Sequence, residues 1–253
     1  MVLIVAVAVV LVIEFVLPGT SYAWGPGMHV YVGASALKYI QELVPAVAVI
    51  LEKNPIYYLY GCLSADIFFG KTGKSTKQKC HTWEIGHKLL EVSKNDQEKA
   101  YAYGFLSHLA ADTIAHNMCL PYFMSLDSRS RKWQHCFWEW QFDRIIANEY
   151  RQLAKRIFRQ SFPEVDRNLC LLTNVRFPVF WTKKVLYART MGGSPRDRKS
   201  FSCVIVFAYL SYHHKSIEHL KKSMSLSLIS VLDVLKNPGA ASCLELDPLG
   251  KLC

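Results

Sequence analysis

The chain has 253 residues, of which 51% are hydrophobic, and it carries a formal net charge of +10. This length and apolar content suit one sizeable globular domain, and they exclude a mainly disordered chain or two very small domains. The excess of Lys and Arg favours partners that bear phosphate, whether nucleic acid, anionic lipid headgroups or small phosphoesters, without choosing among them.

The N-terminal residues 2–17 are almost wholly apolar and are interrupted only by Glu14. Pro18-Gly19-Thr20 ends this run, and Ser21-Tyr22-Ala23 supplies a small-x-small cleavage site. The pattern predicts a signal peptide at residues 1–23 and a secreted or periplasmic protein whose mature chain starts at Trp24. The alternative is an uncleaved membrane anchor, although a run this short with an acid inside it is a poor spanning helix.

Most of the remaining chain shows apolar residues at three- and four-residue spacing, which predicts amphipathic helices with prolines between them. The predicted helices are 28–43, 82–93, 97–118, 131–160, 199–222 and 225–236. The apolar runs 177–180 and 203–209 suit helix or strand, and the polar stretches 70–79 and 192–199 predict loops. Without alternating strands, repeats or a linker, the chain predicts an all-α single domain at 24–236, followed by a poorly packed tail at 237–253.

Three metal-type side chains, His108, Asp112 and His116, are spaced four and four. On an α-helix this spacing places them within an arc of roughly 80°, as one wall of a metal site. A second pair, His135 and Glu139, is also four apart on an amphipathic segment. Asp143 follows one turn later, either as an acceptor for a ligand or as a surface acid near Arg144.

Further candidates lie upstream. Asp66 is a lone acid in apolar sequence and needs a partner, for which a metal ion is suitable. His81 lies where a loop enters a predicted helix, a frequent position for functional groups. After cleavage, the amino and carbonyl groups of Trp24 could chelate a metal, and His29 could add an imidazole, with glycines at 25 and 27 allowing the bend.

The other potential ligands lack such a pattern. His87, His213, His214 and His219 have no partner at metal-ligand spacing, and we predict that they are not ligands. The eight cysteines form no CxxC pair, which argues against a zinc finger. Export would permit disulfides, but their pairing cannot be read from the sequence, and thiolate ligation by Cys80 or Cys136 is disfavoured beside the neighbouring histidines.

In this order and spacing, the candidates resemble the zinc-dependent phospholipase C/D family, in the superfamily that also holds the S1/P1-type single-strand nucleases. The matching elements are Trp24-Gly25-x3-His29, Gly61-x4-Asp66, His81-Thr82-Trp83, Ser107-His108-Leu109-Ala110-Ala111-Asp112-x3-His116 and His135-x3-Glu139. They cover about residues 24–143, and no motif follows residue 150. The short Trp24–His29 spacing looks more like the nucleases, whereas the longer block from Ser107 looks like the phospholipase C/D-type domain.

The resemblance implies a multi-helix phospholipase C/P1 nuclease-like fold with up to three zinc ions (Zn2+). By position, Asp66, His81, His108 and Asp112 would hold the first zinc, His116, His135 and Glu139 the second, and Trp24 with His29 the third. Asp112 would bridge the first and third zinc ions. Asp66 would orient or deprotonate the attacking water, and is the predicted catalytic residue.

These features predict a secreted zinc-dependent hydrolase of phosphodiesters, most simply a phospholipase C that contacts the membrane surface peripherally. The enzymatic alternative is a single-strand nuclease, with base-stacking candidates Trp83, Trp133, Trp138 and Trp140. The non-enzymatic alternative is a membrane-tethered or lipid-binding domain with an uncleaved N-terminal segment.

Overall fold

The computed structural model describes residues 24–68, 80–126, 138, 141–143, 145–190 and 214–250. Every regular element within these ranges is a helix, which confirms the predicted all-α fold. The predicted signal peptide, the polar stretches 70–79 and 192–199, the apolar run 203–209, His135 and Glu139 lie outside the described residues. None of the helices in the described ranges combines the length and apolar character that a membrane crossing requires.

The longer helices are α2 (Pro26–Leu37), α3 (Pro45–Lys53), α4 (Pro55–Ser64), α6 (Trp83–Glu91), α7 (Asp96–Ile114), α8 (Leu120–Ser125), α10 (Asn148–Phe158), α11 (Pro163–Thr173), α12 (Phe177–Thr190) and α14 (His214–Lys236). Short helical turns are η1 (Ile40–Glu42), η2 (Ala65–Phe68), η3 (Ala115–Cys119) and η5 (Ser242–Glu245). Helices α2, α3, α4 and α11 each begin at a proline, whose fixed φ and missing N–H suit the first helical turn. Three of these helices, α3, α4 and α11, were not revealed by the apolar spacing alone.

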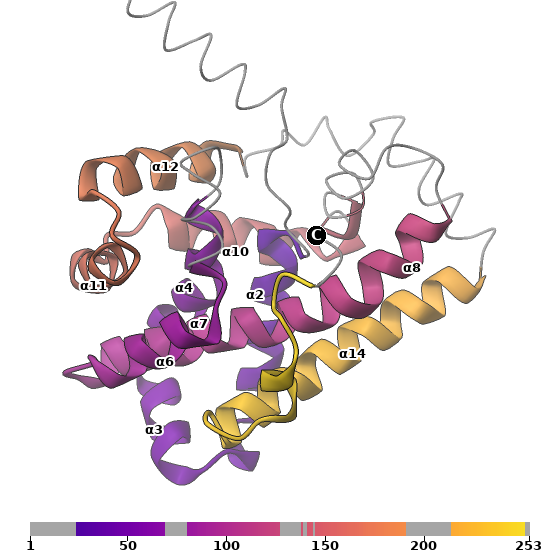
Figure 1. Cartoon of the computed structure of the whole chain (residues 1–253), viewed down its shortest axis with the longest axis horizontal. Helices are drawn as coiled ribbons and strands as arrows, with labels where there is room; N and C mark the ends of the chain where they lie inside the picture. The colour runs from indigo at the N-terminus through magenta and orange to yellow at the C-terminus, as the bar shows by residue number, and fades with distance from the viewer. Residues whose placement is uncertain are drawn as a thin grey trace, which may run out of the picture.

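Helix α7 is the centre of the fold. From Ala100 to Ile114 every residue except Tyr103 is buried, so the helix is covered on all sides. Helix α14 lies along it, and α4, α6 and α2 pack on its other faces (Figure 1). Because α7 carries two of the candidate ligands, this packing places them inside the protein.

Helices α4 and α7 cross closely at a pair of glycines. A Cβ atom built on Gly104 would lie 1.9 Å from the carbonyl oxygen of Tyr58, and one built on Gly61 would lie 2.1 Å from that of Tyr101. No side chain fits there, and the close approach brings the C-terminal part of α4 and the following turn η2 against the face of α7 that bears His108.

Several predicted helix boundaries were wrong, for local physical reasons. The segment predicted as one helix over 131–160 breaks at Ala147, which has an extended ψ of 133°, and α10 starts only at Asn148. The predicted gap between 222 and 225 is absent, because α14 continues through its serines, and the hydroxyl of Ser223 donates to the carbonyl of His219 at 2.9 Å. The run 177–180 is the start of α12.

The expectation of a poorly packed tail was wrong for residues 238–250. Ala241 and Cys243 are buried, and the indole of Trp83 donates to the carbonyl of Leu246 at 3.0 Å. The amide of Asn117 donates to the carbonyl of Asp247 at 2.9 Å. The backbone of this segment is thus tied to α6 and to η3, although its composition gives no helix-length pattern.

Candidate metal centre

The turn of α7 from His108 to Asp112 forms one wall of the candidate site. Both side chains are buried, and His108 Nε2 lies 3.1 Å from Asp112 Oδ2, as the four-residue spacing predicts. His108 Nδ1 donates its hydrogen to the carbonyl oxygen of Cys62 in α4 at 2.9 Å. This bond leaves the lone pair on Nε2, the atom that points towards the other candidates.

Asp66 and His81 form the opposite wall. Asp66 lies in η2, immediately after α4, and its Oδ1 is 3.3 Å from His81 Nε2 and 3.8 Å from His108 Nε2. His81 precedes α6, whose first turn is capped by the hydroxyl of Thr82 accepting from the N–H of Ile85. The two imidazoles meet at 3.3 Å between their Nε2 atoms.

His29 comes to this cluster from α2. Its Nε2 lies 3.3 Å from Asp112 Oδ1 and 3.9 Å from Asp66 Oδ2, and its ring stacks on that of His108 at 3.9 Å between centroids. The start of α2 has no side-chain cap of its own, because its N-cap is Gly25.

Asp143 supplies the missing cap of α2. Its Oδ1 accepts from the N–H of Met28 at 3.0 Å, and its carboxyl lies against Gly25 and Gly27, where any Cβ would be 2.7 Å or less from a neighbouring side-chain atom. A carboxylate at a helix N-terminus satisfies unpaired N–H groups. Burial raises the pKa of Asp143, while the N–H groups of Met28 and Gly27 and the charge of Arg151 act in the opposite direction. Asp143 therefore fixes the helix that carries His29 and is not a surface acid.

Two overlapping groups of ligand atoms result. The groups are His29, Asp66 and His108, and His81, His108 and Asp112, with the atoms of each group within 4.8 Å of one another. The two carboxylate oxygens of Asp112 face different imidazoles, Oδ1 towards His29 and Oδ2 towards His108 and His81. The carboxylate of Asp112 thus lies beside imidazoles of both groups.

The hydrogen bonding of these atoms fits a metal. Both ring nitrogens of His29 and Oδ1 of Asp112 are buried and make no hydrogen bond with any described residue. Buried polar atoms are seldom left so, because their desolvation is costly, and a divalent cation would satisfy them. Imidazole nitrogen and carboxylate oxygen are also the donor types that zinc binds in hydrolytic enzymes.

The electrostatics favour the charged forms of this cluster. Burial alone would lower the pKa of His108, but the carboxylates of Asp112 and Asp66 raise it to about 9. Burial alone would raise the pKa of Asp112, but His108 and His29 hold it well below its usual range. The carboxylates of Asp66 and Asp112 therefore strongly stabilise positive charge between them. A bound cation would supply this charge in place of protons on the imidazoles.

The other predicted ligands stand as follows. His116 is buried on the π-helical turn η3, and neither group includes it. Its expected partners His135 and Glu139 are outside the described ranges, so a separate second site stays a prediction. The side chain of Trp24 is buried, and its indole donates to the hydroxyl of Ser227 at 3.1 Å.

The histidines predicted not to be ligands fall outside both groups where they are described. His87 Nε2 donates to the carbonyl oxygen of Pro238 at 2.7 Å, and His219 stacks on Tyr122 at 3.9 Å. His213 and the side chain of His214 lie outside the described residues.

The described cysteines belong to neither group of ligand atoms: Cys62, Cys80, Cys119, Cys170 and Cys243. Of the tryptophans considered for base stacking, Trp138 is a core residue packed on Phe123 and Phe142, and Trp83 is bonded to the C-terminal segment. Trp133 and Trp140 are not among the described residues. The ring of Trp138 is therefore not available for base stacking.

Sequence reasoning missed two partners of the cluster. The carbonyl of Cys62 carries no side-chain signal, so only the crossing of α4 and α7 reveals it. The hydroxyl of Tyr187 in α12 donates to Asp66 Oδ2 at 3.5 Å, from a part of the chain without any recognisable motif. Beside it on α12, Lys184 donates to Asp166 at 2.7 Å, and Tyr60 donates to the same carboxylate, forming a buried polar network behind the site.

The described part of the chain is helical and holds a buried histidine–aspartate cluster whose ligand atoms could bind a divalent cation. The sequence profile of the family described as zinc-dependent phospholipase C matches residues 28–176, more than half of the chain. The chain belongs to this family, in agreement with the resemblance of its motifs. No curated protein and no solved structure showed significant similarity to it.

Proposed function

We propose that this protein is an exported phospholipase C that hydrolyses the headgroup phosphodiester of phospholipids at a site with up to three zinc ions. Membership of the zinc-dependent phospholipase C family supports the reaction class. The observation that carries the proposal is the buried carboxylate of Asp112, whose two oxygens face His29 on one side and His81 and His108 on the other.

Zinc bound by these residues would supply positive charge for the phosphoryl oxygens and lower the pKa of a bound water. The chain's own contribution is to hold the ligand atoms in place. The hydrogen bond to Cys62 keeps Nε2 of His108 available, and the cap from Asp143 fixes the helix that bears His29. Such outer partners orient ligands and tune their affinity.

Asp66 is the proposed proton acceptor. Its Oδ1 lies near His81 Nε2 at 3.3 Å, while Oδ2 accepts from the hydroxyl of Tyr187 at 3.5 Å. In this proposal Asp66 orients the attacking water and takes its proton, and Tyr187 positions the carboxylate. A general base of this kind contributes roughly 10²–10⁴-fold to rate.

The test uses the mature chain from Trp24, with phosphatidylcholine, phosphatidylinositol and single-stranded DNA as substrates. The proposal expects hydrolysis of a phospholipid, loss of activity after chelation, and recovery with added zinc. Release of diacylglycerol indicates cleavage on the C side, whereas phosphatidic acid would indicate the D side. Turnover of DNA alone, or activity indifferent to chelation, would contradict the proposal.

Export is tested separately by sequencing the N-terminus of the protein made in a cell that processes signal peptides. A chain that begins at Trp24 is expected, since only cleavage frees the amino group that is proposed to join His29 as a ligand. A chain that retains residues 1–23 would contradict this part of the proposal and support a membrane anchor.

A further inference from the structure

The corner between α11 and α12 exposes an unusual set of side chains. Four of the thirteen exposed large hydrophobic residues in the described ranges fall within eleven consecutive positions, namely Leu171, Phe177, Val179 and Trp181. Leu171 is 72% exposed and Trp181 is 56% exposed, so neither contributes much to the core. Apolar side chains gathered in this way on a surface mark a binding face more often than chance exposure does.

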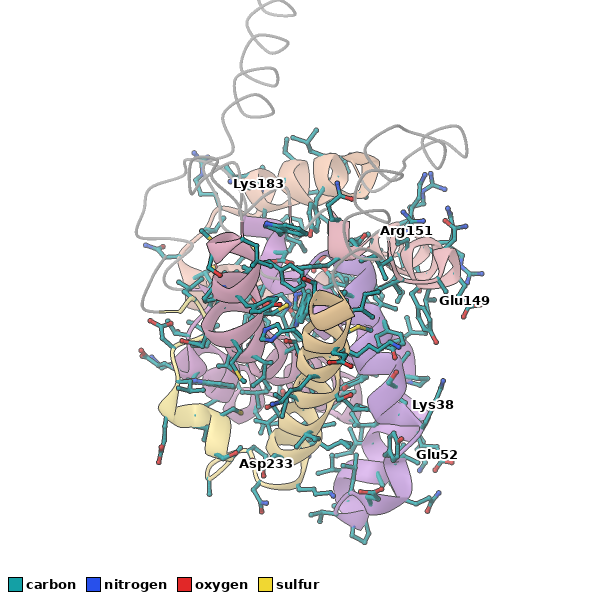
Figure 2. All side chains as sticks on the ribbon, turned by 90° about the vertical axis from the view of Figure 1, so that its right-hand side faces the viewer. Lys38, Glu52, Glu149, Arg151, Lys183 and Asp233 are labelled. Carbon is teal, nitrogen blue, oxygen red and sulfur yellow. The ribbon has the colours of Figure 1, made fainter. Side chains whose placement is uncertain are left out.

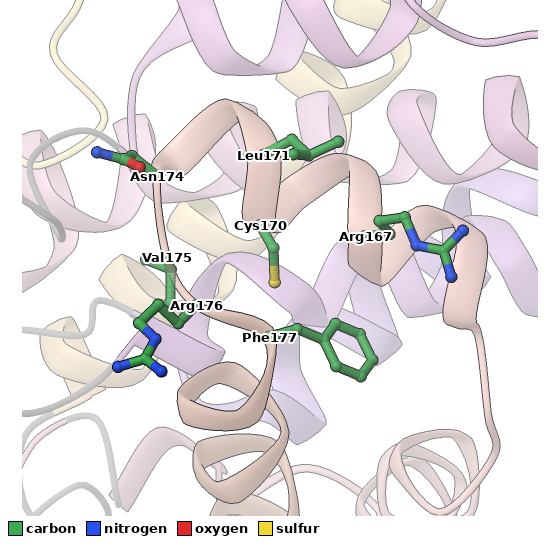
Figure 3. A pocket seen from close by; sticks show the side chains of 7 residues that line it. All are labelled: Arg167, Cys170, Leu171, Asn174, Val175, Arg176 and Phe177. Atoms are coloured by element: carbon green, nitrogen blue, oxygen red, sulfur yellow. The ribbon is translucent and has the colours of Figure 1, made fainter.

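The side chains at this corner adjoin one another. Phe177 and Trp181 are four residues apart on α12 and therefore share one face of the helix. Phe177 also lines a hollow of about 440 Å³ together with Leu171 from the end of α11 (Figure 3). Apolar groups from two successive helices thus meet at one place on the surface.

Two arginines flank the same hollow. Arg167 and Arg176 lie on its two sides, with Cys170 between them and Phe177 below (Figure 3). Both are exposed, and the wider segment 145–190 holds nine Lys or Arg residues against three Asp or Glu. The corner therefore combines exposed aromatic and aliphatic groups with a local excess of positive charge.

We propose that the docking corner, defined as Arg167, Leu171, Arg176, Phe177 and Trp181, seats the protein on anionic phospholipid bilayers. This inference rests on the proposed function, because it names the surface through which the same site reaches its substrate. Trp and Phe side chains settle at the boundary of headgroups and acyl chains, and arginines beside them pair with lipid phosphates. An aliphatic residue as exposed as Leu171 suits an acyl environment better than a stacked nucleobase.

The position of the corner relative to the candidate metal centre suits this role. Helix α12 begins at Phe177, and ten residues later Tyr187 donates to Asp66. At a rise of about 1.5 Å per residue, Tyr187 is separated along the helix axis by roughly 15 Å from Phe177 and by roughly 9 Å from Trp181. A protein seated by this corner holds the cluster within a short distance of the headgroup layer.

The experiment compares sedimentation of the mature protein with vesicles of phosphatidylcholine alone and of phosphatidylcholine mixed with phosphatidylserine. Arg167→Gln/Arg176→Gln should lower binding to the anionic vesicles by roughly fivefold for each charge removed. Phe177→Ser/Trp181→Ser should lower binding to both vesicle types by about tenfold or more.

Matched controls lie elsewhere on the molecule. Ile229→Ser removes an apolar side chain that is 60% exposed on α14, and Lys38→Gln/Lys53→Gln removes two charges near α3, at the opposite end of the molecule from α12 (Figures 1 and 2). Both controls should bind vesicles as the wild type does. Thermal melting should be unchanged in all four variants, since the substituted side chains are exposed.

Enzyme assays separate this inference from the proposed function. Turnover is measured on vesicles and on a short-chain monomeric phospholipid, and the first is divided by the second. For the corner variants this ratio should be at least tenfold lower than for the wild type. If the wild type turned over neither substrate, the proposed function would fail, while vesicle binding would still test the docking corner.

Absence of vesicle binding by the wild type would overturn the inference. Corner variants that bind vesicles as the wild type does would also overturn it. In that case a loss of affinity for single-stranded DNA would assign the corner to nucleic acid, and a change from dimer to monomer in size-exclusion chromatography would assign it to contact between copies of the chain.

Discussion

The close crossing of α4 and α7 predicts that Gly104→Ala will be destabilising, although alanine is the better helix former. The new Cβ would lie 1.9 Å from the carbonyl oxygen of Tyr58, whereas ordinary contacts begin at 3.4 Å. The two helices must therefore separate by about 1.5 Å, because the contacted atom is backbone and has no rotamer to change.

The energetic cost follows from this shift. Overpacking in a core lowers the free energy of unfolding by about 1–3 kcal/mol and occasionally more, and a backbone clash belongs at the upper end. The gain in helix propensity offsets about 1 kcal/mol of this. We expect the free energy of unfolding of Gly104→Ala to be about 2 kcal/mol below that of the wild type.

The same shift affects the candidate metal centre. The carbonyl of Cys62 in α4 accepts from His108 of α7 at 2.9 Å, a bond that cannot survive a separation of about 1.5 Å. Loss of such an outer partner reduces metal affinity by roughly 10–100-fold. Competition with a chromogenic chelator measures this affinity, and urea unfolding in the presence of a chelator measures the stability without metal.

Gly239→Ala is the matched control. A Cβ at Gly239 meets no atom within 4 Å, so this variant should equal or slightly exceed the wild type in stability and should bind zinc normally. If Gly104→Ala matched Gly239→Ala in both assays, the close crossing and its role in positioning His108 would be refuted.

Three further predictions concern the surroundings of the site. Lys184→Met leaves the carboxylate of Asp166 without its buried cation, and should lower the free energy of unfolding by about 3–5 kcal/mol. In thermal melts, the double variant Asp166→Leu/Lys184→Met should recover part of this loss, because it removes the carboxylate as well. Tyr187→Phe should lower kcat roughly tenfold while the zinc content stays unchanged, since it removes the hydroxyl that positions Asp66; an unchanged kcat would remove Tyr187 from the mechanism. Burial raises the pKa of Cys119 to about 12 and that of Cys243 to about 11, above the ordinary value of 9.0. Above pH 9 the unfolded chain therefore loses thiol protons that the folded chain keeps, and stability should fall by up to about 1.4 kcal/mol per pH unit for each thiol until the folded pKa is reached. Cys119→Ala should make this slope shallower in unfolding measured from pH 8 to 11, and an unchanged slope would contradict the assignment.

The spacing of polar residues predicted which side chains of the candidate site lie close together. His108 and Asp112 share a face because a regular α-helix fixes that geometry, and His29, Asp66 and His81 join them as the order of the family motifs implied. The π-helical turn that holds His116 leaves no mark in the apolar pattern, and the role of His116 stays a prediction because His135 and Glu139 lie outside the described residues.

The surroundings of the site could not be predicted in the same way. The acceptor for His108 is a backbone carbonyl, and Tyr187 is a single tyrosine remote in sequence, so each is defined only once the helices are packed. Helix boundaries followed apolar periodicity where one face was buried, as in α6, but not in α3 and α4, where prolines start short helices. The C-terminal segment packs through backbone bonds, for which composition gives no signal.

We propose that the buried histidine–aspartate cluster binds zinc and that Asp112 is shared between two ions. The most direct test of this proposal is the zinc content of the purified mature chain and of three variants, measured by mass spectrometry of the metal. We expect more than one zinc ion per wild-type chain, a loss of more than one ion in Asp112→Ala, a loss of mainly one in His116→Ala, and no loss in the exposed control Glu52→Ala. A wild-type chain without zinc, or an Asp112→Ala variant with the full complement, would contradict it.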